Sequence, residues 1–177
     1  KHNITPEVIV SNVDEDEIKN SLLAEGASPL IISKNLAELK SVKVSIKNPD
    51  SLVLGADSVV SLNNKIINKP KSRKEALSIL KKLNNSMHYL ISSVCISKNG
   101  SMIWNYSDTS ELKMKKFKDE ELVNYLDKIK TEILMAYGVY QVEADGLDLF
   151  EYIKGDRDSI MGLPIKQIMN YIKKYNK

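Results

Sequence analysis

The spacing of apolar and polar residues predicts alternating strands and helices along this chain. Runs or alternations of apolar residues predict strands over residues 7–10, 52–60, 65–67, 89–96, 102–104, 109–114, 139–142 and 147–153. Apolar residues three and four apart predict helices over residues 14–25, 28–44, 72–83, 118–129 and 165–172. Because hairpin-like strand pairs are mixed with strand–helix units, we expect an α/β fold with a mixed sheet rather than a purely parallel one.

Composition limits the classes of protein that this sequence can encode. The 177 residues are 42% hydrophobic, enough for one well-cored domain over 1–177 or for two small lobes that share a cleft. The 26 basic residues only just outnumber the 23 acidic ones and are scattered, so we expect no nucleic-acid partner. A single cysteine, Cys95, rules out an internal disulfide and suits a cytoplasmic protein. No apolar run approaches the roughly 20 residues of a membrane helix, so we expect no membrane partner.

The most informative candidate for chemistry is Asp57, a lone carboxylate within a strand-like apolar run. Burying an unpaired carboxylate is costly, so this acid requires a partner such as a metal ion or a lysine. The small pair Gly55-Ala56 would let a ligand approach the backbone, and Lys69 places an ammonium group a short loop away. This combination suits a metal-bound phosphate. The alternative is an aspartate that caps a turn or meets a structural lysine.

Other polar residues have simple structural interpretations when each is taken alone. Glu15 lies among four consecutive acids, which are typical of a solvated helix start, and Lys40 follows as an exposed helix lysine. His88 precedes an apolar strand, where a lone histidine is more often structural than a ligand. The glycines are isolated from one another, so neither a Walker loop nor a dinucleotide-binding fingerprint is present, and no cluster has zinc-ligand spacing.

Taken together in order, short segments along nearly the whole chain resemble motifs of the Maf family of nucleoside triphosphate pyrophosphatases. These segments are Val13-Asp14-Glu15, Leu36-Ala37-Glu38-Leu39-Lys40, Gly55-Ala56-Asp57-Ser58, Lys69-Pro70, His88 with Ser92, residues 138–143 (Gly-Val-Tyr-Gln-Val-Glu), Gly155-Asp156 and Gly162-Leu163-Pro164. Each segment is a weak signal alone, and their shared order and spacing make the match specific. The resemblance implies an elongated mixed sheet with flanking helices and two lobes around a cleft.

The resemblance also implies an activity and the residues that perform it. Asp57 matches the catalytic acid and a ligand of a divalent ion, Mg²⁺ or Mn²⁺, and Glu15 matches a second carboxylate that helps to hold that ion. Lys40 and Lys69 match lysines that contact the triphosphate. The implied reaction releases a nucleoside monophosphate and pyrophosphate, and the enzyme is expected to be a homodimer. The alternative is a relative that binds nucleotides or a partner protein without turnover.

Three further residues fall at positions that the resemblance links to substrate binding. Ser58 and Glu143 match positions associated with base preference, and His88 matches the histidine of the His-x-x-x-Thr/Ser element. Ala144 stands where the family tends to have glycine. The family usually begins with a strand and a Ser-x-Ser-Pro-Arg-Arg loop that this sequence does not contain, and we expect that segment to precede Lys1 in the full protein.

Overall fold

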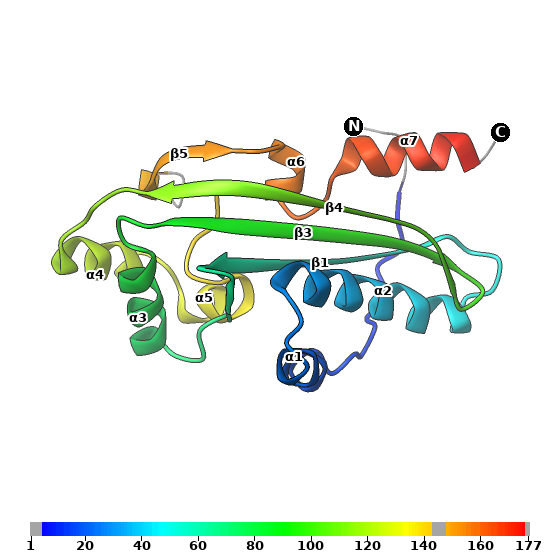
Figure 1. Cartoon of the computed structure of the whole chain (residues 1–177), viewed down its shortest axis with the longest axis horizontal. Coiled ribbons are helices and arrows are strands. Elements are labelled where there is room, and N and C mark those ends of the chain that lie inside the picture. Colours follow the sequence, from blue (N-terminus) through cyan, green and yellow to red (C-terminus); the bar gives the residue numbers. More distant parts are fainter. Residues whose placement is uncertain (1–4, 143–147, 176–177) are drawn as a thin grey trace.

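A computed structural model describes residues 5–142 and 148–175, and its main feature is a long five-stranded sheet (Figure 1). The strands are β1 (Val53–Leu62), β2 (Lys65–Ile67), β3 (Met87–Lys98), β4 (Ser101–Met114) and β5 (Phe150–Lys154), in the spatial order β2-β1-β3-β4-β5. All four described strand pairs are antiparallel. The elongated α/β fold is confirmed, but the expected mixture of strand directions is not found among these pairs. Two-residue turns join β1 to β2 and β3 to β4, and such short turns impose antiparallel pairing.

Helices cover both faces of this sheet and gather at one of its ends (Figure 1). They are α1 (Glu15–Ala24), α2 (Pro29–Lys47), α3 (Arg73–Leu83), α4 (Asp119–Asp127), α5 (Thr131–Tyr137), α6 (Arg157–Ile160) and α7 (Ile165–Tyr175). Helix α2 lies along one face of the sheet and α7 along the other, whereas α3, α4 and α5 lie together at one end. The side chains of Ser28 and Ser72 cap α2 and α3, since each accepts a hydrogen bond from a backbone N–H of the first turn.

Several elements differ from the expectations. Residues 7–10 form no strand, and Val8 and Val10 are 90% and 76% exposed. Residues 139–142 form no strand either, although Val139 and Tyr140 are buried, so their apolar character reflects packing in a loop. Helices α5 and α6 were not predicted, and the segments 102–104 and 109–114 belong to one continuous strand, β4. A strand needs a hydrogen-bonded neighbour, and the apolar pattern of a segment does not contain that information.

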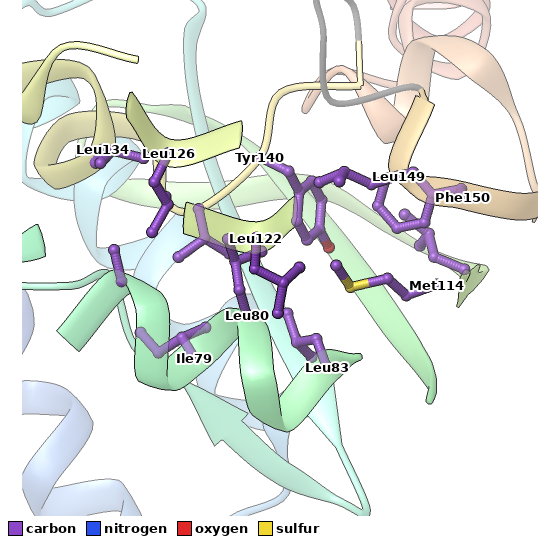
Figure 2. Packing of buried hydrophobic residues seen from close by; sticks show 13 residues of the cluster. Ile79, Leu80, Leu83, Met114, Leu122, Leu126, Leu134, Tyr140, Leu149 and Phe150 are labelled. Atoms are coloured by element: carbon purple, nitrogen blue, oxygen red, sulfur yellow. The ribbon is translucent and has the colours of Figure 1, made fainter. Parts of the chain in front are cut away.

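Two apolar clusters hold the two ends of the molecule. The larger one joins α3 and α4 to the end of β4 and to the loop residue Tyr140, whose ring meets that of Phe150 edge to face at 4.9 Å (Figure 2). The smaller one lies under α7, where the rings of Trp104 and Tyr171 stack at 5.0 Å. Burial of these groups removes apolar surface from water in both clusters and stabilises the fold.

Helix α2 approaches β1 very closely at Gly55. A Cβ atom at this position would lie 2.3 Å from the carbonyl oxygen of Ala37 and 2.7 Å from the backbone nitrogen of Ser41. The hydroxyl of Ser33 also donates a hydrogen bond to the carbonyl oxygen of Asp57 across 3.0 Å. The expectation that Gly55 admits a ligand is therefore wrong for its Cα face, which is occupied by α2. The contact at Gly55 instead accompanies the placement of the preceding turn of α2, which carries Ser33, next to Asp57.

Candidate active site

Lys40 joins two carboxylates that come from distant parts of the sequence. Its Nζ atom lies 2.8 Å from Asp57 Oδ1 on β1 and 2.8 Å from Glu15 Oε1 in the first turn of α1. The same ammonium group donates to the carbonyl oxygen of Ala56 across 3.4 Å. Lys40 is therefore partly buried and triply engaged rather than an exposed helix lysine, and the prediction that Asp57 has a lysine partner is confirmed.

Burial and charge act against each other at Asp57. The residue is 8% exposed, and its Oδ2 atom is buried without a hydrogen-bond partner among the described residues. Burial raises the pKa of this carboxyl, the attraction and hydrogen bond of Lys40 oppose the rise, and the net result is a pKa above the ordinary value. The unpartnered oxygen and the raised pKa give Asp57 the features of a group that exchanges protons or binds a cation.

The partners of Asp57 remain charged at neutral pH. Burial acts to lower the pKa of Lys40, but Asp57 and Glu15 outweigh burial and raise it above its ordinary value. Burial acts to raise the pKa of Glu15, but Lys40, Lys19 and Lys69 outweigh burial and lower it. Lys19, one turn after Glu15 on α1, lies 3.6 Å from the Glu15 carboxylate. The site thus holds lysines and carboxylates in close proximity.

A cavity of about 90 Å³ adjoins this cluster through Lys19, the ion-pair partner of Glu15. Its lining includes Lys19 from α1, Ser58 from β1, Lys69 after β2 and Tyr140 from the loop that follows α5. A larger hollow of about 220 Å³ lies between α2 and β4 and contains none of the sequence-predicted site residues. The smaller cavity is the better candidate for a site that binds an anion, because two lysines line it, whereas one lysine and one glutamate, Lys34 and Glu38, line the larger hollow.

The residues expected to bind substrate occupy different places. Ser58 is exposed in the cavity lining, on the opposite face of β1 from Asp57 because neighbouring strand residues alternate. His88 is fully buried, and its Nε2 atom lies 2.9 Å from the hydroxyl of Tyr140, which does line the cavity. Burial lowers the pKa of His88 to about 4, so its ring is neutral at physiological pH. Glu143 lies outside the described residues.

Sequence reasoning missed two polar residues at this site. Lys19 is four residues after Glu15, a helical spacing that predicts an ion pair, so this residue could have been found. Ser92 was named only as the last residue of the His-x-x-x-Thr/Ser element and was given no role, yet its hydroxyl lies 2.9 Å from that of Ser58. The register of β1 and β3 pairs these two residues directly, and no local pattern contains that register.

The described residues hold no group of three or more histidine, cysteine, aspartate or glutamate side chains that could bind a metal ion. Glu15 and Asp57 offer two carboxylates, linked through Lys40. In the part of the chain that the structure describes, no helix has the length and apolar character needed to cross a membrane.

The fold is an antiparallel sheet flanked by helices, and a cluster of lysines and carboxylates lies near a small cavity. These features define a class of protein suited to polyanionic ligands. The sequence matches the model of the Maf family, described as Maf-like protein, over residues 1–175, and the chain belongs to this family. A nucleoside triphosphate pyrophosphatase of Pelagibacter ubique is 57% identical over 98% of this chain and 89% of its own length. Proteins of the same name from Ruegeria pomeroyi and Caulobacter vibrioides are each 36% identical, over 92% and 94% of this chain and 82% and 83% of their own lengths.

Proposed function

We propose that this protein hydrolyses nucleoside triphosphates between the α and β phosphates and releases a nucleoside monophosphate and pyrophosphate. The carrying observation is the buried carboxylate of Asp57, which Lys40 holds near a cavity that Lys19 and Lys69 line. The names of the relatives and the family match support the same activity. The proposal treats residues 1–177 as a single catalytic domain.

The lysines divide between holding the carboxylates and attracting the substrate. Lys69 lines the cavity and, within residues 5–142 and 148–175, has no ion-pair partner as close as those of Lys40, so it is suited to bind the triphosphate. An ammonium group has three donors, and those of Lys40 point to Asp57, Glu15 and the carbonyl oxygen of Ala56. Lys40 can therefore contact a phosphate only by exchanging one of these partners. Its principal role in this proposal is to orient the two carboxylates.

Glu15 and Asp57 fit a divalent cation. Mg²⁺ prefers oxygen ligands and is commonly held by one or two carboxylates together with substrate phosphates, and the buried Oδ2 atom of Asp57 is without a partner among the described residues. A bound ion would neutralise charge on the phosphates. Asp57 orients the attacking water and accepts a proton from it, a role that its raised pKa favours.

The central test is the Asp57→Asn variant, which keeps the size of the side chain and removes its charge. Turnover of nucleoside triphosphates with Mg²⁺ or Mn²⁺ should fall by about 10² to 10⁴, the usual contribution of a general base. Asp127→Asn is a matched control, because the side chain of Asp127 is 67% exposed and pairs with Arg73 at the surface, away from the cavity lining. Turnover within about twofold of the unmodified protein in Asp57→Asn would contradict the assignment of the general base.

The products provide a second test. Chromatography should detect monophosphate and pyrophosphate, whereas release of diphosphate and inorganic phosphate would refute cleavage at the α phosphate.

Lys69→Ala should raise KM for the triphosphate with little change in melting temperature, because an exposed lysine contributes little to stability. Nucleotide binding without any product would favour the alternative function, a binding protein without turnover. The homodimer and the cytoplasmic location stay predictions, and light scattering tests the former.

A further inference from the structure

A chain of hydrogen bonds leads from the cavity into the interior of the protein. The hydroxyl oxygen of Ser58 lies 2.9 Å from that of Ser92 on β3. The hydroxyl of Ser92 lies 2.7 Å from the carbonyl oxygen of Ser159 on α6. Ser92 and Ser159 are each 1% exposed, whereas Ser58 is exposed to the cavity. The chain therefore has one end at the cavity and the other end in the buried contact between β3 and α6.

The direction of these hydrogen bonds follows from the chemistry of the groups. A carbonyl oxygen accepts and cannot donate, so the single hydroxyl proton of Ser92 is committed to the carbonyl oxygen of Ser159. Ser92 can then only accept from Ser58, and the proton of Ser58 points to Ser92. What remains available on Ser58 toward the cavity is a lone pair. In this arrangement Ser58 accepts hydrogen bonds from a ligand and does not donate them.

The far end of the chain is held in place by α6 and the turn that follows it. Asp156 Oδ1 accepts hydrogen bonds from the backbone nitrogen and the hydroxyl of Ser159 across 3.0 and 3.3 Å. Gly162, in the turn after α6, is a neighbour of Ser58, because a Cβ atom on it would lie at an ordinary contact distance of 3.8 Å from the Ser58 hydroxyl oxygen. The carbonyl oxygen of Ser159 thus has a fixed position, which preserves the direction of the chain.

Ser58 and Asp57 are neighbours on β1, and their side chains lie on opposite faces of the sheet. Ser58 and Lys69 line the same cavity. A ligand whose phosphates lie by Lys69 can therefore reach Ser58 with another of its parts. The base of a nucleotide is the part of such a ligand that carries N–H groups.

We propose that Ser92, held by the carbonyl oxygen of Ser159, fixes Ser58 as a hydrogen-bond acceptor, so that Ser58 selects bases that present an N–H group to it. This proposal rests on the proposed function, because it places a nucleotide base at Ser58. Ser92 is a positioning residue here, since it acts through Ser58 and does not touch the substrate.

Pairs of nucleotides that differ by an oxo and an amino group test the proposal well. In UTP and CTP, and equally in ITP and ATP, donors and acceptors are exchanged at both the ring nitrogen and the exocyclic atom. Whichever of these atoms meets Ser58, an acceptor-only hydroxyl favours one member of the pair. A hydroxyl that can turn either donates or accepts and favours neither member strongly. Once a bound base covers Ser58, a mispaired polar group there costs enough to give a preference of about tenfold in kcat/KM.

The experiment compares the preference in the unmodified protein with that in two serine variants. Ser92→Ala removes the acceptor that holds the Ser58 proton, and the preference should fall from about tenfold to within about twofold of equality. Ser93→Ala is the matched control, because Ser93 is equally buried on the same strand and bonds to Ser107 across 2.9 Å instead. It should keep the preference. If Ser92→Ala does not fold, Ser92→Cys replaces the oxygen with a weakly accepting sulfur and should also lower the preference.

The outcomes separate this proposal from the proposed function. Loss of the preference in the Ser92 variant alone supports the role of Ser92. An equal preference in both variants and the unmodified protein, the same loss in both variants, or no preference in the unmodified protein overturns it. If hydrolysis is absent, calorimetric Kd values for the same four nucleotides with Mg²⁺ give the same comparison. Failure of the unmodified protein to hydrolyse or bind any of the four refutes the proposed function itself.

Discussion

Replacing Lys40 by methionine would leave Asp57 as a buried carboxylate without its counter-ion. Methionine retains much of the length and apolar character of the lysine stem, so the packing of α2 changes little while the charge disappears. The two contacts of 2.8 Å from Nζ to Asp57 and to Glu15 are lost together. The two remaining carboxylates then repel each other, as the effect of Glu15 on the pKa of Asp57 already indicates.

The loss of stability in Lys40→Met can be worked out from the ion pair between Lys40 and Asp57. At 2.8 Å and an effective dielectric constant of about 20, the attraction between Lys40 and Asp57 is about 6 kcal/mol before the cost of removing both groups from water. Breaking a buried pair typically costs about 3 to 5 kcal/mol. The side chain of Lys40 is 18% exposed and so partly solvated, and we therefore expect a loss of about 2 to 3 kcal/mol in the free energy of unfolding. For a chain of this size, that corresponds to a fall of about 5 to 10 °C in melting temperature.

The loss of unfolding free energy caused by Lys40→Met should increase as the pH rises. Burial already raises the pKa of Asp57, and removing Lys40 raises it further because the opposing attraction is lost. An acid whose folded pKa is raised destabilises the folded state as pH rises through that pKa. The cost of Lys40→Met should therefore be largest at about pH 7.5 and smaller at about pH 5. The stabilisation from Lys40 itself is complete throughout this range, because its pKa is raised and is reached only at alkaline pH.

Urea unfolding with a chelator present measures these free energies without bound metal. The double variant with Asp57→Asn should recover most of the stability lost in Lys40→Met, because no uncompensated charge then remains. The reasoning is refuted if the double variant is as unstable as Lys40→Met, or if the cost of the single substitution is the same at both pH values. Either result would assign the loss to packing rather than to charge.

Three other perturbations test the framework around the site. Gly55→Ala should lower the free energy of unfolding by about 3 kcal/mol or more, because the added Cβ would lie 2.3 Å from Ala37 O; thermal melting within 2 °C or so of the unmodified protein would contradict this. Arg73→Ala should lose about 1 to 3 kcal/mol in urea unfolding through its bonds to the carbonyl oxygens at the end of α4, whereas the neighbouring control Lys74→Ala should lose almost nothing. His88 has its pKa lowered to about 4, so the stability from its neutral ring is present above about pH 6.5 and is lost, by up to about 3 kcal/mol, as pH falls toward 4; an equally steep loss in His88→Phe would contradict that source.

Much of the site could be predicted from the sequence, because the types of residue present indicate its chemistry. A carboxylate within an apolar strand had to have a partner, and Asp57 does meet a lysine. The helices that carry Glu15 and Lys40 were predicted from apolar spacing and caps, and both are present. The family match over residues 1–175 confirms the resemblance drawn from short motifs in order. The roles of the individual residues stay predictions.

The sequence by itself determined the periodic elements, the hairpins and the need for a counter-ion, because these depend on neighbours within a few residues. Only the tertiary structure decided that Lys40 binds Glu15 and Asp57 together, that Gly55 serves helix packing, and that residues 7–10 form no strand. It also decided that Ser92 directs the hydroxyl of Ser58, since strand register brings together residues 34 positions apart. Long-range contacts depend on which surfaces bury each other, and that is a property of the whole fold rather than of any local pattern.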